Sequence, residues 1–580
     1  MANLCNHFIS KIESWSQVYP DRAALHHVSE AKPDGIKVWK TFSWSQYFEE
    51  VQLVANGLIA LGFKEKDCAS IVGRNRPEWL FAQMAIMAAG GISTSVYTSN
   101  SPNEVAYIIN HSNSQFIFAE DKIQYDKIIK ERANLPGLQK IILMDSVTNS
   151  DPTWTITYEQ LKELGRIQSR VELKNRIQKI VEDDVAFYVY TSGTTGDPKA
   201  VITNNRGLIY MGTELLKRFP PAKKVRLLSY LPLSHIAEQT VTNIVHLQTG
   251  GEVFMCREIE SLKDYLIDVR PSILLGVPRV WEKVEVALKA RFKKLSLIQF
   301  TLLKFAMKIE FDYFSLSSKK GILINPLGRV LVNTMILSKI RKKLGVDKLQ
   351  YALTGAAPIS KSTQDFFASL GIPVMEIYGL TESLGVAISS IPTKPISGSI
   401  GYPLNGVKVK IAEDGELLLQ SLAVTTGYYK DQKATDELLV DGWLHTGDIA
   451  TRSADGSYRI TDRKKEIIIT AGGKNVTPSK IENYLKSIPG ISQAVLIGDK
   501  RPYLVALLTL ETETSEKSIA EQILEINKLL PKDESIKKFK VLPAQFTIES
   551  GEMTPTQKLK RRVIHERYSK QINELYSELQ

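Results

Sequence analysis

The chain has few cysteines and no long uninterrupted hydrophobic stretch. Only three of its 580 residues are cysteines, Cys5, Cys68 and Cys256. This odd, scattered set excludes a disulfide framework and paired metal-ligand spacing. No segment reaches the roughly 18 apolar residues that a membrane-spanning helix needs, and residues 1–21 lack the apolar core of a secretion signal. We therefore expect a reduced, cytoplasmic protein that is soluble, or at most peripheral at a membrane surface.

The sequence also lacks the short motifs of several common enzyme classes. The Gly-x-x-x-x-Gly-Lys-Ser/Thr pattern of P-loop nucleotide hydrolases is absent, as are the Gly-x-Ser-x-Gly elbow and the HExxH zinc motif. Basic residues are dispersed and do not form an aromatic-basic recognition module, so no nucleic-acid partner is expected. These absences argue against simple hydrolase chemistry.

What the sequence does have is an ordinary globular composition, with 43% hydrophobic and 24% charged residues. Its length suggests two to four domains. The net charge of +11 favours anionic partners such as nucleotides, phosphates or acidic lipid surfaces, without choosing between them.

Apolar spacing alternates between helical and strand periods, which predicts layered α/β structure. In the first part of the chain the expected helices are 51–61 and 79–89, and the expected strands are 68–72, 115–119, 140–144 and 185–191. After a charged cluster at 462–466 we expect helices at 478–487 and 518–530 and strands at 494–497 and 503–510. We place a domain boundary at this cluster, giving a large domain 1–464 and a small domain 465–580. Thr477 before Pro478 is the expected N-cap of the first helix of the small domain.

Residues 287–343 form a basic helical stretch. Its apolar residues fall roughly on one face, and lysines surround them. The members of this face are Phe292, Leu295, Ile298, Leu302, Phe305 and Ile309. Two interpretations stay open: the helix rests on anionic lipid, or it packs on the core through this face and its lysines are solvated.

The strongest chemical signal is the loop that follows the strand at 185–191. Residues 190–199 read Tyr-Thr-Ser-Gly-Thr-Thr-Gly-Asp-Pro-Lys. The glycines let the backbone approach an oxyanion closely, the hydroxyls and amides donate to it, and Lys199 adds positive charge. This loop is therefore predicted to bind phosphate.

The loop resembles the triphosphate-binding loop of the adenylate-forming superfamily, which includes the acyl-CoA synthetases, and the resemblance spans nearly the whole chain. It implies an α/β fold, with a large multi-subdomain N-terminal adenylate-forming domain and a small mobile α+β C-terminal domain. The ATP ligands that it implies in this loop are Thr191, Ser192, Gly193, Thr194, Thr195, Gly196 and Lys199.

Two further segments match the family's adenine-binding motifs. In Thr-Gly-Ala-Ala-Pro at 354–358, small residues allow a flat base to lie against the backbone. In Tyr-Gly-Leu-Thr-Glu-Ser at 378–383, Tyr378 supplies a stacking face and Glu382 a hard oxygen ligand for Mg²⁺. The resemblance implies Thr191 as a second magnesium ligand. The other nucleotide-binding residues that it implies here are Gly355, Ala356, Ala357, Gly379 and Thr381.

One acidic and one basic residue are expected to bind the ribose. Residues 443–448, Trp-Leu-His-Thr-Gly-Asp, resemble the family segment whose aspartate accepts hydrogen bonds from both ribose hydroxyls, which makes Asp448 the expected ligand. Arg463 matches a second ribose contact. Lys465 matches the hinge about which the small domain rotates.

The small domain is expected to serve both half-reactions. In Thr-Pro-Thr-Gln-Lys-Leu-Lys at 554–560, Lys558 matches the catalytic lysine that completes the adenylation site, with Lys560 as the alternative. Gly472 and Gly473 are expected to face the CoA channel, since glycines permit close approach.

Residues 231–239 and 276–283 resemble long-chain fatty acyl-CoA synthetases, and most closely their bubblegum-type subgroup. His235 is expected near the carboxylate end of the acyl site, although a structural role for it stays open, and Trp281 is expected to be a packing residue. The implied reaction uses ATP and Mg²⁺ to make acyl-AMP from a fatty acid, and then CoA to make acyl-CoA. A fatty carboxylate is ionised at pH 7, so the first step needs positioning and charge neutralisation rather than a general base.

Two other functions are weighed against this one. A fatty acid–AMP ligase would deliver its adenylate to a carrier protein, but such relatives carry an extra segment that hampers rotation, and none is evident near Lys465. A catalytically inactive lipid-binding relative is disfavoured because the family's charged site residues occur together. Those residues are Lys199, Glu382, Asp448, Arg463 and Lys558.

Overall fold

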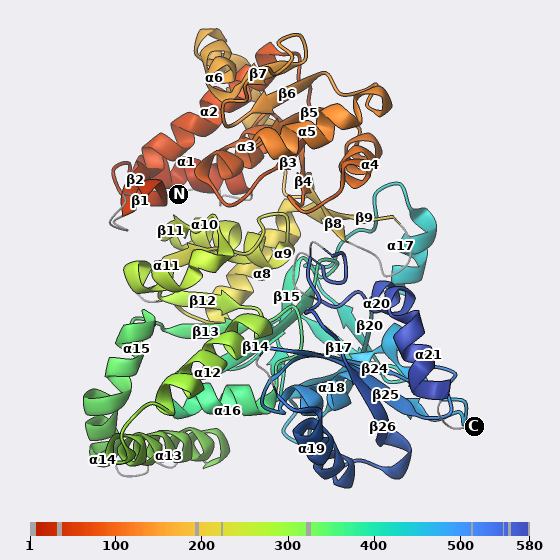
Figure 1. Cartoon of the computed structure of the whole chain (residues 1–580). Coiled ribbons are helices and arrows are strands. Elements are labelled where there is room, and N and C mark those ends of the chain that lie inside the picture. Colours follow the sequence, from red (N-terminus) through yellow and green to blue (C-terminus); the bar gives the residue numbers. More distant parts are fainter. Residues whose placement is uncertain are drawn as a thin grey trace. The chain divides into compact units, whose positions relative to one another are not determined.

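The computed structural model (Figure 1) describes residues 7–31, 37–191, 197–221, 224–320, 326–511, 514–548, 550–554 and 558–577. The chain forms two compact units. Unit 1 consists of Met1–Ser397, Gly401–Lys408 and Leu419–Leu444, and unit 2 of Gly398–Ile400, Val409–Leu418 and His445–Gln580. The boundary that we place at residue 465 concerns the part expected to rotate, and it stays a prediction.

Unit 1 contains a seven-stranded sheet in the order β7-β6-β5-β3-β4-β8-β9. Its strands are parallel except for the antiparallel pair β8–β9. They are β3 (Cys68–Val72), β4 (Ile92–Val96), β5 (Ser114–Ala119), β6 (Lys140–Leu143), β7 (Thr155–Thr157), β8 (Val185–Thr191) and β9 (Lys199–Asn204). Every residue of β3 is buried, which explains its unbroken apolar run in the sequence.

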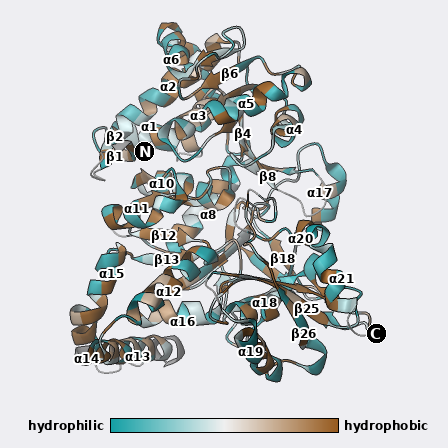
Figure 2. Cartoon of the chain, viewed as in Figure 1, coloured by the Kyte–Doolittle hydropathy of each residue, from teal (hydrophilic) through white to brown (hydrophobic). Residues whose placement is uncertain are grey.

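Helices alternate with these strands, as predicted. They are α2 (Trp44–Ala60), α3 (Pro77–Ala88), α4 (Pro102–Ser112), α5 (Lys122–Lys130), α6 (Tyr158–Ile167) and α7 (Arg170–Lys179). Helix α2 begins earlier than predicted because Ser43 and Gln46 form a capping box ahead of its apolar run. Figure 2 shows both hydrophobic and hydrophilic stretches along α2 and α6, as expected for helices that cover a sheet with one face.

A second sheet of unit 1 has nine strands in the order β16-β15-β14-β13-β12-β10-β11-β1-β2. They are β1 (Ala23–Ala31), β2 (Lys37–Ser43), β10 (Arg226–Ser229), β11 (Glu252–Met255), β12 (Ile273–Gly276), β13 (Tyr351–Thr354), β14 (Val374–Leu380), β15 (Gly385–Ser389) and β16 (Tyr402–Pro403). The neighbours β10, β12, β13 and β14 are parallel. The segments that follow these four strands therefore leave the sheet along one edge, and each carries a predicted motif.

The basic stretch is helical, as predicted. Its helices are α12 (Pro278–Phe292), α13 (Leu297–Lys320), α14 (Pro326–Val332) and α15 (Ser338–Leu344). Within the described part of α13 the buried side chains are Leu303, Ala306 and Glu310, whereas Ile298, Leu302 and Phe305 are 75%, 52% and 60% exposed. The interpretation that α13 packs through the predicted face is wrong for these three residues. The packing face lies one residue further along the helix.

No helix in the described part of the chain is long and apolar enough to cross a bilayer.

Unit 2 contains a three-stranded sheet in the order β24-β25-β26, in which β24–β25 is antiparallel and β25–β26 parallel. Its main elements are α18 (Pro478–Lys486), β24 (Ile491–Ile497), β25 (Leu504–Leu510), α19 (Glu516–Lys528), β26 (Ile536–Val541), α20 (Arg561–Arg567) and α21 (Ser569–Ser577). Thr477 is the N-cap residue of α18 and Pro478 follows it, but the Thr477 side chain makes no capping hydrogen bond.

A further sheet contains five strands. Its order is β17-β18-β20-β19, with β21 paired to β20. The strands are β17 (Lys408–Ile411), β18 (Glu416–Gln420), β19 (Leu439–Val440), β20 (Trp443–Arg452) and β21 (Tyr458–Arg463).

Two glycines allow α2 and α6 to approach closely. A Cβ atom at Gly57 would overlap the carbonyl oxygen of Leu161, and one at Gly165 would overlap that of Leu53. We expect Gly57→Ala and Gly165→Ala each to lower the free energy of unfolding by about 1–3 kcal/mol, because the helices must separate. Urea denaturation measures this change. Gly137→Ala is the control, since nothing lies within 4 Å of its added Cβ, and an equal loss in that variant would contradict the explanation.

Candidate active site

The predicted phosphate loop joins two paired strands. Thr191, the last residue of β8, pairs with Lys199, the first residue of β9, and the Thr191 hydroxyl donates to the Lys199 carbonyl at 3.4 Å. Five of the predicted ATP ligands lie outside the described residues: Ser192, Gly193, Thr194, Thr195 and Gly196. The two strand ends therefore fix where the loop leaves and rejoins the sheet.

The side chain of Lys199 meets two residues that sequence reasoning missed. Its Nζ lies 5.0 Å from the centroid of the Tyr428 ring and 3.8 Å from Oδ2 of Asp431. The Tyr428 hydroxyl donates a 2.7 Å hydrogen bond to Oε1 of Glu382. The predicted phosphate-binding cation and the predicted magnesium ligand are thus brought to one tyrosine.

Backbone pairing puts Tyr428 there. The Ile202 amide donates to the Gly427 carbonyl at 3.1 Å, and the Tyr429 amide donates to the Ala200 carbonyl at 2.9 Å. Residues 427–429 therefore run along β9, the strand that begins with Lys199. The signal in the sequence was a glycine followed by two aromatics and a lysine, which by itself is too short to identify a site.

The residues around Glu382 fit a magnesium ion that is bound by the protein and by substrate phosphates together. The described residues contain no group of three or more His, Cys, Asp or Glu side chains that could cage a metal. Mg²⁺ commonly binds through one or two carboxylates and takes its remaining ligands from water and substrate phosphate. The single carboxylate of Glu382, bonded to the tyrosine that also contacts Lys199, the predicted phosphate-binding cation, is compatible with this mode of binding.

A tight turn presents Glu382. Oγ of Ser383 accepts from the Leu380 amide at 2.8 Å and donates to the Gly385 carbonyl at 2.9 Å, which closes the turn after β14. A Cβ atom at Gly379 would overlap that same carbonyl, so the predicted nucleotide residue Gly379 has a structural reason to be glycine. Thr381 is buried within the turn.

The two predicted adenine segments leave neighbouring strands. Thr354 at the end of β13 pairs with Glu376 of β14. An added Cβ at Gly355 would lie 2.9 Å from the carbonyl oxygen of Ile377, the residue before Tyr378. Ala356 has a left-handed backbone, with φ of +68°, and Ala357 follows it. The segment 354–357 therefore turns against β14 beside Tyr378, and its role in adenine binding stays a prediction.

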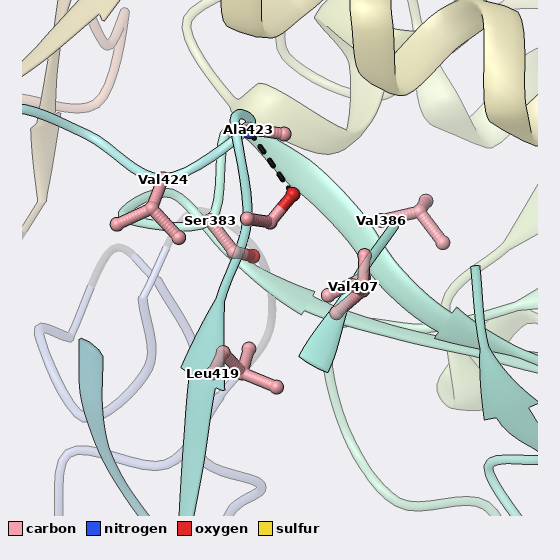
Figure 3. A pocket seen from close by; sticks show the side chains of 8 residues that line it. Ser383, Val386, Val407, Leu419, Ala423 and Val424 are labelled. Carbon is pink, nitrogen blue, oxygen red and sulfur yellow. Dashed lines mark hydrogen bonds between the residues drawn. The ribbon is translucent and has the colours of Figure 1, made fainter. Parts of the chain in front are cut away.

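A small pocket lies behind the turn (Figure 3). Its lining includes Ser383, Val386, Val407 and Leu419, which come from separate segments. Its volume is about 10 Å³, which is about the space of one water molecule. It is too small to hold an acyl chain.

The segment after β10 contains His235. The His235 side chain caps the short helix α9 (Ile236–Glu238), since its Nδ1 accepts from the Ala237 amide at 3.1 Å. This contact is a structural role for His235, and its predicted place near the acyl carboxylate stays a prediction. Trp281 is buried, and its indole Nε1 donates to the Gly276 carbonyl at 3.2 Å. It packs as predicted.

Glu238 is a buried carboxyl group that holds the same segment. It accepts from the Leu231 amide at 3.1 Å and from the Thr242 hydroxyl. Burial raises the pKa of Glu238 to about 7. This carboxyl group therefore takes up a proton far more readily than an exposed one.

Within unit 2, the two predicted ribose ligands lie side by side. Asp448 of β20 pairs with Arg463 of β21 across the antiparallel ladder, and Arg463 Nε donates to Asp448 Oδ1 at 2.8 Å. The Asp448 side chain is buried, so the arginine compensates its charge. Glu416 accepts from the Gly447 amide at 2.8 Å and fixes the turn before Asp448.

The other predicted residues of unit 2 lie on its surface. Lys465 is exposed in the 3₁₀ turn Lys464–Glu466 that follows β21. Gly472 and Gly473 lie in the turn between β22 (Ile468–Ile469) and β23 (Asn475–Val476), and an added Cβ at Gly473, where φ is +75°, would meet nothing within 4 Å. Internal packing therefore does not explain the glycine pair.

Lys558 is exposed, and its backbone is anchored. Its amide donates to Oγ1 of Thr554 at 3.0 Å, and its carbonyl accepts from the Thr554 amide at 2.8 Å. Lys560 is the N-cap residue of α20. The structure gives the two candidate lysines different backbone settings, and the choice of Lys558 stays a prediction.

A profile described as AMP-binding enzyme matches residues 12–429, and one described as AMP-binding enzyme C-terminal domain matches residues 465–580. The chain belongs to the AMP-binding enzyme family. The match confirms the resemblance predicted from the sequence.

Relatives include the long-chain-fatty-acid–CoA ligase ACSBG2 of Xenopus laevis, which is 32% identical over 93% of this chain and 80% of its own. Another is the long-chain-fatty-acid–CoA ligase FadD15 of Mycobacterium bovis, 31% identical over 93% of both chains.

Solved structures confirm the adenylate-forming fold of this AMP-binding enzyme. The anthranilate CoA ligase AuaEII in complex with anthranoyl-AMP covers 98% of both chains with a TM-score of 0.77 and 17% identity. The O-succinylbenzoate coenzyme A synthetase of Bacillus subtilis in complex with AMP covers 95% of this chain and 97% of its own, with a TM-score of 0.70 and 20% identity.

The buried carboxyl group gives the AMP-binding enzyme a specific pH dependence. The pKa of Glu238 is raised to about 7 in the folded protein, whereas that of an unfolded glutamate is about 4.3. The folded state therefore binds this proton more tightly than the unfolded state. The resulting stabilisation is complete below a pH of about 4.3 and is lost as the pH rises through about 7. We expect Glu238→Gln, which stays neutral, to gain about 3 kcal/mol in unfolding free energy relative to wild type between pH 5 and pH 8. Urea denaturation of both proteins at these pH values measures the gain, and a constant difference would contradict the raised pKa.

Proposed function

We propose that this AMP-binding enzyme is a long-chain fatty acid–CoA ligase. It would use ATP and Mg²⁺ to convert a fatty acid into acyl-AMP and pyrophosphate, and then transfer the acyl group to CoA with release of AMP. The observation that carries the proposal is that Tyr428 contacts both Lys199 and Glu382. Lys199 is a cation suited to a polyphosphate, and Glu382 is a carboxylate suited to magnesium. The class of acid is taken from the two relatives named above.

The first half-reaction needs no proton transfer. The fatty carboxylate is ionised at neutral pH and attacks the α-phosphate directly. Lys199 and the loop before it neutralise and orient the triphosphate, and Lys558 adds a second positive charge. Glu382 and Thr191 would hold Mg²⁺, which, when bound, offsets charge on the phosphates. Asp448 accepts from the ribose hydroxyls beside Arg463, and the turns at Gly355 and Tyr378 receive the adenine.

In the second half-reaction, the CoA thiol attacks the acyl carbonyl and AMP leaves. The mixed anhydride makes this possible because AMP is a far better leaving group than the oxide of a free carboxylate. We place the pantetheine next to Gly472 and Gly473, where the absence of side chains leaves room. Lys465 is the proposed hinge for the change between the two half-reactions.

The test is an assay with ATP, Mg²⁺ and palmitate, with and without CoA, that follows AMP, pyrophosphate and acyl-CoA. We expect steady turnover only with CoA, and acyl-CoA as the product. Pyrophosphate release that does not depend on CoA would point to an AMP ligase that serves a carrier protein. No nucleotide consumption with any fatty acid would point to an inactive relative.

Two variants assign the catalytic lysine in this assay. We expect Lys558→Ala to abolish adenylation and to leave thioester formation from supplied acyl-AMP largely intact, because its charge acts on the triphosphate. Lys560→Ala, the matched control two residues away, should retain both half-reactions. The reverse pattern would move the role to Lys560, and equal loss of both half-reactions in Lys558→Ala would refute the division of labour.

We also propose that α13 touches anionic lipid. Its exposed apolar side chains include Ile298, Leu302 and Phe305, and Lys304 and Lys308 stand beside them on the same helix. An apolar face flanked by lysines suits the boundary between acidic headgroups and acyl chains. A bilayer is also where a long-chain fatty acid is concentrated.

Co-sedimentation with vesicles tests this contact. The variant Ile298→Ser/Leu302→Ser/Phe305→Ser should bind phosphatidylglycerol-containing vesicles at least tenfold more weakly than wild type, since each buried side chain contributes about 1.5–3 kcal/mol. The control Ile167→Ser/Val171→Ser removes apolar residues that are 85% and 66% exposed elsewhere in unit 1, and it should bind normally. Unchanged binding by the triple variant would exclude α13 as the contact, and a monomer–dimer shift without lipid would identify a second protein copy as its partner.

A further inference from the structure

Tyr428 contacts both charged residues that the proposed function assigns to the phosphates and the metal. The face of its ring lies under the Lys199 ammonium at 5.0 Å, and its hydroxyl donates to Oε1 of Glu382 at 2.7 Å. The first contact is a cation–π interaction, and the second is a hydrogen bond to a charged acceptor, which is stronger than one between neutral groups. One rigid side chain thus stabilises charges of opposite sign.

The backbone around Tyr428 is held from three directions. Its own amide donates to Oγ1 of Thr435 at 2.9 Å. The flanking residues 427 and 429 are bonded to β9, the strand that begins with Lys199. The Thr425 amide donates to the backbone carbonyl of Glu382 at 2.8 Å. The tyrosine is therefore fixed relative to both of the groups that it contacts.

This arrangement brings two opposite charges to one tyrosine without an ion pair between them. Among the residues that the structure describes, Lys199 forms its ion pair with Asp431 and not with Glu382. A direct Lys199–Glu382 pair would use the charges that the phosphates and the metal need. With the ammonium on the ring face and the carboxylate at the hydroxyl, one carboxylate oxygen is oriented by Tyr428 and the other is the oxygen that would meet the cation.

We propose that Tyr428 is a positioning residue that orients the Glu382 carboxylate toward the metal of Mg·ATP and holds it apart from Lys199. The proposal rests on the proposed role of Glu382 as the magnesium ligand. It predicts that the Tyr428 hydroxyl matters when ATP arrives with the metal and not when ATP arrives alone. A purely structural role would not make this distinction.

The experiment measures ATP binding by titration calorimetry, with Mg²⁺ and with EDTA, to wild type, Tyr428→Phe and Tyr428→Leu. Tyr428→Phe removes the hydroxyl and keeps the ring. We expect it to raise the Kd for Mg·ATP about tenfold, as the loss of a hydrogen bond to a charged group implies, and to leave the Kd for metal-free ATP and the Tm of the free protein unchanged. Tyr428→Leu also removes the ring from Lys199, so it should weaken metal-free ATP as well.

Tyr429→Phe is the matched control. It removes one hydroxyl from the adjacent tyrosine, whose ring stacks on Tyr188 with centroids 4.7 Å apart, and both Kd values should stay at the wild-type level. An unchanged Kd for Mg·ATP in Tyr428→Phe would overturn the proposal, and so would equal weakening with and without metal. If wild type itself binds no Mg·ATP, the proposed function fails, and this inference fails with it.

Discussion

The parallel pairing of β10, β12, β13 and β14 is the constraint on which the candidate site of unit 1 depends. Parallel strands end at the same edge, so four segments far apart in the sequence leave the sheet together. The close approach of Gly355 to the carbonyl of Ile377 shows how tightly two of these segments fit. Without this register, the adenine motif and the turn that carries Glu382 would have no fixed relation.

The phosphate loop belongs to the other sheet of unit 1, and a short segment joins it to this edge. Residues 425–429 bond to β9 on one side and to the Glu382 backbone on the other. The link is made mainly of backbone hydrogen bonds, which tolerate many side chains. Two side chains in or near this segment contact charged groups. Tyr428 donates a hydrogen bond to Glu382, and Asp431 forms an ion pair with Lys199.

Much of this could be predicted from the sequence, for physical reasons. Strand β3 has the predicted bounds because both of its faces are buried. Of the two interpretations open for the basic stretch, packing through the predicted face is wrong for Ile298, Leu302 and Phe305, because apolar residues occur on neighbouring faces of α13 and spacing alone cannot tell Leu303 from Leu302. Tyr428 was not predicted as a site residue, because its proposed role depends on contacts with Lys199 and Glu382, which are distant in the sequence. Asp448 and Arg463 came from family resemblance, and the hairpin β20–β21 explains why they meet.

At the phosphate site that we propose, the carboxylate of Asp431 bears on which anions can bind. It lies 3.8 Å from the Lys199 ammonium, and both side chains are more than a third exposed. Asp431 therefore competes weakly with an incoming anion for Lys199. Chloride or a single inorganic phosphate gains little by replacing a charge that is already present, whereas a nucleotide brings several charges and a base at once. At the proposed site, this ion pair would therefore favour a nucleotide over small anions.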